Sequence, residues 1–118
     1  MIAQLSNIKR VLVDEQVPGD IVGKIKEKFG EVNIEVKWIN TDFPELRGKE
    51  DDEILEWMKE KGFDTILTAN YDMARRAVLN KINILLLFIY DNHRKFVLTR
   101  IVPITGWKIK IIIEEISV

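Results

Sequence analysis

The sequence predicts an α/β domain with a mostly parallel central sheet that is flanked by helices. Short apolar segments alternate with amphipathic segments along the chain, which is the pattern of β-α-β units. The 118 residues, 47% of them hydrophobic, are enough for one domain with a single core. No linker, repeat or low-complexity segment divides the chain, so we expect one domain over residues 1–118.

The first half of the chain contains two predicted strands and one helix between them. Residues 11–13 form a short β-branched apolar run, and residues 33–39 alternate apolar and polar side chains, as a strand toward a sheet edge does. Between them, residues 18–29 carry apolar side chains at helical spacing, and Gly30 follows where a helix C-cap is expected. Residues 40–49 contain a proline and a glycine and predict a loop.

The middle of the chain predicts a helix, a strand and a second helix. Residues 51–61 begin with acids and end with lysines before Gly62, which marks both helix ends. Residues 65–68 form a short strand, and Asn70 is a candidate N-cap for a helix that extends through Leu79.

The last third starts with a clear strand and continues with an ambiguous segment. Residues 84–90 are so apolar that we expect a central strand or one covered on both faces. Residues 91–102 fit an antiparallel strand or a short capped helix, and we favour the helix. Residues 107–116 predict a final strand after a turn.

Composition excludes several classes of function. Without cysteine, the chain has no disulfide, thiolate metal site or cysteine nucleophile. The net charge of −1 provides no overall attraction for nucleic acid, so such binding requires a local basic patch. The longest apolar run is too short to span a bilayer, and no signal peptide is apparent. We therefore expect a cytoplasmic protein without a membrane partner.

Acidic residues follow two of the predicted parallel strands. Asp14 and Glu15 come directly after the first strand, and Asp72 comes shortly after the strand that ends at Thr68. The carboxyl ends of parallel strands share one sheet edge, where ligands bind in such folds. Asp51, which opens the helix after the long loop, can join the acids at this edge.

A cluster of carboxylates requires compensation for its negative charge. Two carboxylates about 4 Å apart repel by roughly 4 kcal/mol near a protein surface. Either one carboxyl takes up a proton, or a divalent cation binds. Mg²⁺ and Mn²⁺ prefer oxygen ligands, and such an ion can support phosphodiester hydrolysis. The sequence therefore predicts a Mg or Mn site.

Three segments resemble PIN-like domains, in particular the small prokaryotic DUF5615 or Mut7-C-like branch. The resemblance spans residues 9–90 and consists of Leu12-Val13-Asp14-Glu15, Asp51-Asp52-Glu53-Ile54-Leu55 and Thr68-Ala69-Asn70-Tyr71-Asp72. It implies a three-layer PIN-like fold and a Mg- or Mn-dependent ribonuclease site. Asp14, Asp51 and Asp72 occupy the matching catalytic and metal-binding positions. The resemblance also implies RNA as substrate and an antitoxin protein as a partner.

Two residues depart from the family pattern. Asn70 stands where the pattern has an aspartate, and Met73 stands where it has a phenylalanine. Losing a carboxylate lowers the expected metal affinity, although the Asn70 carbonyl oxygen can still act as a ligand. The alternative function is thus a PIN-like RNA- or protein-binding module without catalysis, dimeric through the apolar strand at residues 108–116.

Several candidate residues also have purely structural explanations. Asp51 and Asp72 lie where acids favour any helix N-terminus by about 0.3–1 kcal/mol. Asn70 serves as an N-cap as well as a supporting residue of the site, together with Glu15 and Thr68. Asp14 is different, because it lies too far before the next helix to cap it, and an acid after a buried strand is costly unless it is solvated or liganded.

Two basic clusters are candidates for RNA binding. Arg75 and Arg76 follow Asp72, and Arg94 and Lys95 follow the lone histidine, His93. Ordinary solvated positions explain both clusters equally well.

A receiver-like phosphoacceptor domain is a third hypothesis. It would use Asp14, Glu15 and Thr68, but no lysine follows the strand at residues 84–90 in the expected place.

Overall fold

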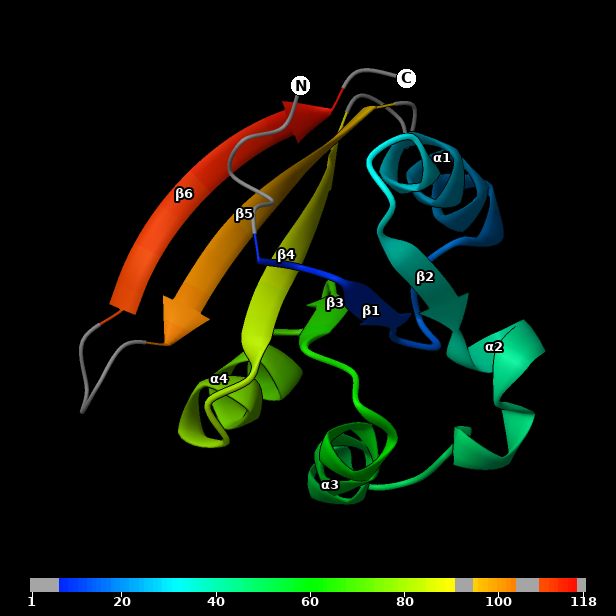
Figure 1. Ribbon diagram of the computed structural model, residues 1–118, viewed down its shortest axis with the longest axis vertical. Coiled ribbons are helices and arrows are strands. Elements are labelled where there is room, and N and C mark those ends of the chain that lie inside the picture. Colours follow the sequence, from blue (N-terminus) through cyan, green and yellow to red (C-terminus); the bar gives the residue numbers. More distant parts are fainter. Residues whose placement is uncertain (1–6, 91–94, 104–108, 117–118) are drawn as a thin grey trace.

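The computed structural model describes residues 7–90, 95–103 and 109–116, and gives side-chain surroundings up to residue 103. Six strands form one sheet in the order β2-β1-β3-β4-β5-β6 (Figure 1). The strands are β1 Arg10–Val13, β2 Glu35–Trp38, β3 Thr65–Thr68, β4 Asn83–Tyr90, β5 Lys95–Pro103 and β6 Ile109–Ile116. The helical segments are α1 Gly19–Gly30, α2 Ile39–Asp42, the 3₁₀ turn η2 Pro44–Leu46, α3 Asp51–Lys61 and α4 Tyr71–Leu79.

The sheet combines a parallel half with an antiparallel half. Strand β1 pairs in parallel with β2 and β3, and β3 pairs in parallel with β4. Strand β5 runs antiparallel between β4 and β6. The parallel strands therefore end along one edge, where Val13 pairs with both Trp38 and Leu67.

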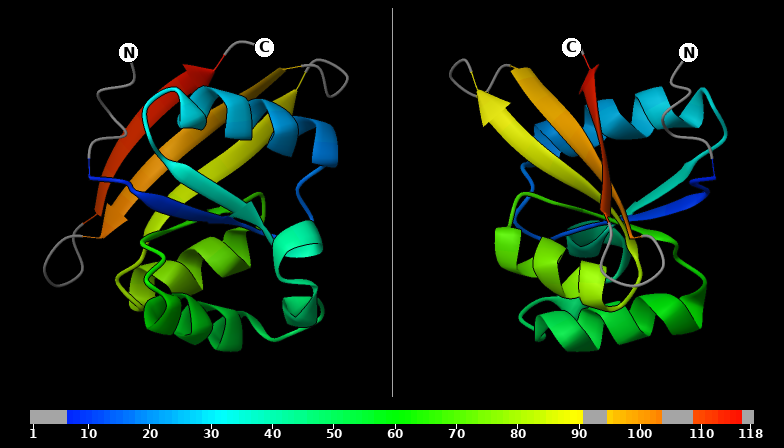
Figure 2. Two further views of the ribbon diagram at one scale, coloured as in Figure 1. Left: turned by 45° about the vertical axis from the view of Figure 1, so that its right-hand side comes forward. Right: turned by 90° about the vertical axis from the view of Figure 1, so that its left-hand side faces the viewer.

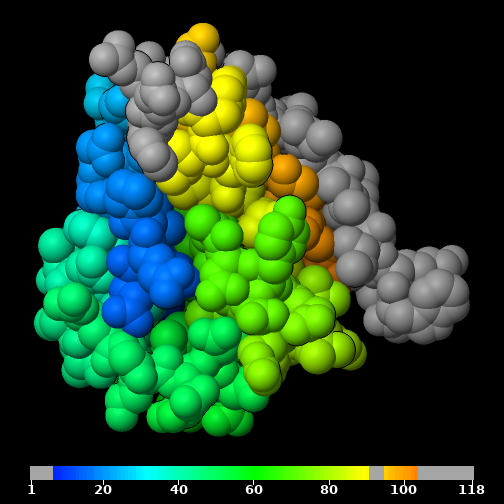
Figure 3. Space-filling model, turned by 180° about the vertical axis from the view of Figure 1, so that it is seen from behind, coloured from blue at the N-terminus to red at the C-terminus, as the bar shows by residue number. Residues whose placement is uncertain are grey.

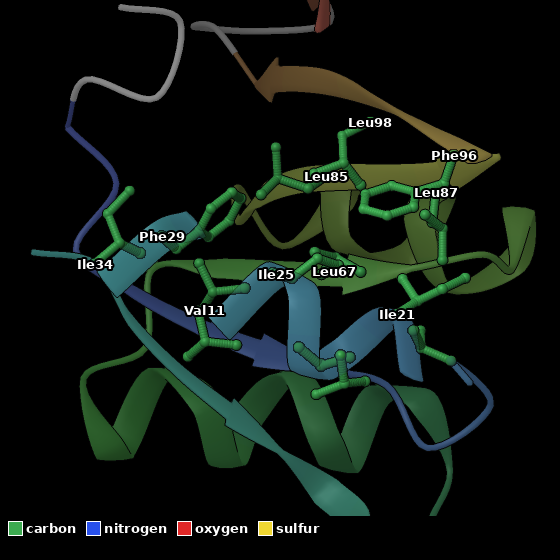
Figure 4. Close-up of a cluster of buried hydrophobic side chains, with 14 of the residues drawn as sticks. Val11, Ile21, Ile25, Phe29, Ile34, Leu67, Leu85, Leu87, Phe96 and Leu98 are labelled. Carbon is green, nitrogen blue, oxygen red and sulfur yellow. The ribbon is translucent and has the colours of Figure 1, made fainter. Parts of the chain in front are cut away.

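Helices cover both faces of the sheet. Helix α1 packs on one face, while α3 and α4 lie on the other (Figures 1 and 2). Within β1, Val11 and Val13 belong to the α1 core and Leu12 belongs to the opposite core, as the two-residue period of a strand requires. Figure 4 shows side chains of α1, among them Ile25 and Phe29, against residues from β1, β3, β4 and β5. Each such buried side chain contributes roughly 1.5–3 kcal/mol.

Most predicted elements are confirmed. Helix α3 and strand β3 have the predicted bounds, and Gly62 caps α3 with a φ of 80°. Strand β2 lies at a sheet edge as expected, and β4 lies inside the sheet. The predicted C-terminal end of α1 is wrong, because Gly30 belongs to the helix and Glu31 is its C-cap. The predicted loop over residues 40–49 contains most of α2 and all of η2.

The helix favoured for residues 91–102 is wrong, since Lys95–Pro103 is strand β5. Phe96, Leu98 and Arg100 are buried and alternate with more exposed neighbours, which is a strand period. Pairing with β4 on one side and β6 on the other satisfies the backbone groups that a helix would have paired internally. Residues 91–94, which include His93 and Arg94, lie outside the described residues.

Among the residues that the structure describes, no helix has the length and apolar character needed to cross a bilayer.

Candidate active site at the carboxyl edge of the sheet

Asp14 is a buried carboxylate at the carboxyl end of β1. Its side chain is only 6% exposed, although it follows the strand as a loop residue. The Thr68 hydroxyl donates to its Oδ2 at 2.9 Å, and the Glu15 backbone N–H donates to its Oδ1 at 2.9 Å. Its own N–H donates to Leu67 O at 2.9 Å, so neighbouring strands fix the residue.

A chain of hydrogen bonds joins Asp14 to the start of α4. The Thr68 hydroxyl oxygen accepts from the Asn70 N–H at 3.0 Å. The Asn70 side-chain oxygen in turn accepts from the Asp72 N–H at 2.8 Å, which confirms Asn70 as the N-cap of α4. On the molecular surface, the residues after β1 (blue) lie against those after β3 (green) in Figure 3. The segments after β1 and β3 thus form one connected unit.

The Asp14 carboxyl has an environment that disfavours its charged form. Burial raises the pKa of Asp14, and the hydrogen bonds from Thr68 and Glu15 offset part of this effect. The negative charges of Asp51 and Glu15 raise the pKa further. Asp14 takes part in no ion pair among the described residues.

Asp51, the first residue of α3, connects Asp14 electrostatically to Asp72. Burial raises the pKa of Asp51, the Arg76 charge lowers it, and the charges of Glu50, Asp52 and Asp72 raise it again. Asp51 therefore interacts with Asp72 as well as with Asp14. The three predicted acids come to the same edge, but the described residues include no group of three acids or histidines placed to hold a metal ion.

A polar hollow of about 440 Å³ lies between the starts of α3 and α4. Asp51 and Asp72 line it, while the buried Asp14 does not. The remaining lining residues are Lys49, Glu50, Asp52, Arg75 and Arg76. Charged side chains of both signs therefore line the hollow.

The two arginines of the hollow are held loosely. Arg75 pairs with Asp72 at 2.8 Å and Arg76 pairs with Asp52 at 3.0 Å, and all four side chains are more than half exposed. Exposed pairs of this kind contribute about 0–1 kcal/mol. Both arginines can therefore exchange a carboxylate for a phosphate at little cost.

Glu15 supports the loop that follows β2. Its Oε1 accepts from the Gly48 N–H at 3.0 Å, and Arg47 lies 3.8 Å from Oε2. Its backbone oxygen accepts from Asn40 Nδ2 at 3.2 Å. The Asn40 Oδ1 atom is buried without a hydrogen-bond partner among the described residues. Glu15 thus orders the segment that leads to Asp51.

Sequence reasoning missed Asn40, Lys49 and Asp52 as neighbours of the site. Asn40 follows β2, so its place at the carboxyl edge was the available signal. The predicted RNA-binding residue Lys95 is exposed at the start of β5 and does not line the polar hollow.

The oxygen donors of Asp14 and Asp51 fit a hard cation such as Mg²⁺ or Mn²⁺. A carboxylate offers about four lone-pair positions, and the hydrogen bonds from Thr68 and Glu15 use two of those on Asp14. Magnesium usually binds through one or two carboxylates and several waters. Asp14 and Asp51 supply that number of carboxylates, and a coulombic interaction connects them.

Comparison with protein-family models, curated proteins and solved structures finds no match to this chain.

Proposed function

We propose that this protein is a PIN-like, Mg- or Mn-dependent ribonuclease that hydrolyses RNA phosphodiesters at the carboxyl edge of the sheet. The observation that carries the proposal is the buried Asp14 carboxylate, whose pKa is raised and whose charged neighbours include Asp51. A buried anion among other anions destabilises the fold unless it takes up a proton or a cation compensates its charge, and such perturbed groups are typical of functional sites. A divalent cation is the ligand that would compensate this charge.

Each side chain of the site has a proposed role. Asp14 and Asp51 would hold the ion, and Asp72 would complete the catalytic set across the polar hollow. Thr68 fixes the orientation of the Asp14 carboxylate, as its 2.9 Å hydrogen bond supports. Arg75 and Arg76 would bind the phosphates that flank the reactive one. When bound, the metal would supply an activated water and compensate the charge that develops on the phosphate.

The PIN-like assignment rests on the order of the acids and on the α/β architecture. Asp14 follows β1, Asp51 opens α3 and Asp72 lies in the first turn of α4, in the order of the family pattern. The three-layer arrangement, with α1 on one face and α3 and α4 on the other, is compatible with that family. We also propose the role that the resemblance implies, as the toxin of a toxin–antitoxin pair.

The test is RNA cleavage by wild-type protein and matched variants in the presence of Mn²⁺ or Mg²⁺. We expect single-stranded RNA to be cleaved, chelation to stop the reaction, and Asp14→Asn to lower the rate by at least about 100-fold. Asp20→Asn is the control, because Asp20 is an exposed acid in the first turn of α1. Unchanged activity in Asp14→Asn would exclude the proposed site.

A non-catalytic binding module is the second candidate, and Asn70 favours it. Its side-chain oxygen already caps α4, so it offers less to a metal than the aspartate of the family pattern. Titration calorimetry with Mn²⁺ separates the two functions. The nuclease predicts binding by wild-type protein and tighter binding by Asn70→Asp, which keeps the cap and adds a carboxylate oxygen. No binding by either protein at millimolar Mn²⁺ would support the binding module.

A further inference from the structure

A second hollow of about 440 Å³ adjoins the polar one, and its lining is largely apolar. It lies between α4 and β5, and its apolar walls are formed by Tyr71, Ala74, Val78, Leu79 and Ile101. Tyr71 and Leu79 are each 78% exposed, more than any other large apolar side chain described. Such a hollow exposes an aromatic ring and aliphatic walls to solvent, which favours the binding of a flat apolar group.

The apolar and polar hollows share two walls. Asp72 and Arg75, which both belong to α4, line both hollows, so the two hollows meet along this helix. A ligand that spans this boundary would place an anionic group beside Arg75 and a flat group against Tyr71. A nucleotide has these two parts, because one residue of the strand carries both a phosphate and a base.

We propose that the apolar hollow is a nucleobase subsite in which one base of single-stranded RNA stacks on Tyr71 while its phosphate contacts Arg75. This inference rests on the proposed ribonuclease function for the identity of the ligand. Stacking on an aromatic ring tolerates any base, so the subsite would position the strand without selecting a sequence. Because Tyr71 is one residue before Asp72, a base stacked on Tyr71 would anchor the RNA strand next to the acidic site.

The charge of the polar hollow determines how the subsite must be tested. Its four acids outnumber its three basic residues, so a phosphate is repelled until a cation binds. Binding should therefore be measured with Ca²⁺, which takes the same oxygen ligands as Mg²⁺. Gel electrophoresis after each titration would check that the RNA remains intact.

The experiment compares two RNAs and four proteins by fluorescence anisotropy. The RNAs are a short labelled oligoadenylate and the same oligomer with abasic sites, and the proteins are wild type, Tyr71→Ala, Tyr71→Phe and Phe88→Ala. Phe88 is the matched control, because it is an aromatic residue that is 64% exposed and lines neither hollow. Cleavage of unmodified RNA with Mn²⁺ is measured in parallel.

We expect Tyr71→Ala to weaken binding of the oligoadenylate by about 5- to 100-fold and to leave binding of the abasic oligomer unchanged. Tyr71→Phe should keep the wild-type affinity, since it keeps the ring, and so should Phe88→Ala. An equal loss for both RNAs, or the same loss in Phe88→Ala, would overturn the subsite. So would a wild-type dimer that Tyr71→Ala converts to a monomer, because the hollow would then be a self-association surface.

The parallel cleavage assay separates this inference from the proposed function. If the protein cleaves RNA but Tyr71→Ala binds RNA as tightly as wild type, the base subsite is rejected and the ribonuclease function is retained. If Tyr71→Ala weakens RNA binding but the wild-type protein does not cleave RNA, the subsite is retained and the ribonuclease function is rejected.

Discussion

At the scale of single residues, Asp14 shows how a site can oppose stability. Burial raises the pKa of its carboxyl above the ordinary value of 3.8, and the charges of Asp51 and Glu15 raise it further, although the hydrogen bonds from Thr68 and the Glu15 N–H offset part of this effect. The native state therefore holds the Asp14 proton more tightly than the unfolded state does. The resulting stability is fully present below the unfolded pKa and is lost as the pH rises through the raised native pKa.

The variant Asp14→Asn should remove this pH dependence. We expect it to gain stability relative to wild type as the pH rises from about 4 to about 7.5, because the amide carries no charge to desolvate. Urea unfolding of both proteins at the two pH values measures the difference. A variant that is less stable than wild type at neutral pH would show that the ionised carboxylate stabilises the fold and would weaken the argument for a functional charge.

At the scale of elements, two glycines differ in whether their position needs a glycine. Gly62 caps α3 with a φ of 80°, and a Cβ there would lie 3.2 Å from the Arg10 guanidinium. Gly23 lies inside α1, where a Cβ would meet no atom within 4 Å apart from its chain neighbours and the backbone of its own helix. Sequence alone identified Gly62 as a cap, because the acids and lysines of residues 51–61 marked both helix ends.

These glycines predict a pair of stability changes. Gly62→Ala should cost about 1–2 kcal/mol, since the left-handed conformation crowds a Cβ. Gly23→Ala should stabilise by roughly 0.5–1 kcal/mol, because alanine loses less backbone freedom in a helix. Denaturant unfolding of both variants checks the signs. A destabilised Gly23→Ala would mean that α1 packs against a neighbour at this position.

At the scale of the whole molecule, local sequence patterns predicted the elements of the parallel half of the sheet, whereas pairing between strands determined the structure of the antiparallel half. Residues 65–68 and 51–61 carry unambiguous strand and helix patterns, and both were predicted correctly. Residues 95–103 fit both periods, and pairing with β4 and β6 makes them a strand. The acids could be assigned to one edge from chain order, whereas the two hollows depend on side-chain packing that no local pattern encodes.

The whole-molecule charge leads to a final prediction about RNA binding. A net charge of −1 gives no long-range attraction, so affinity should depend on a few local contacts and vary little with salt. Each phosphate neutralised on a single strand contributes about −0.7 to the slope of log K against log salt. Arg76→Ala should therefore reduce the slope by about 0.7 in anisotropy titrations with Ca²⁺. Lys28→Ala is the control, because Lys28 is exposed on α1, on the other side of the sheet, and this variant should leave the slope unchanged. Equal changes of the slope in both variants would mean that RNA binds without using the polar hollow.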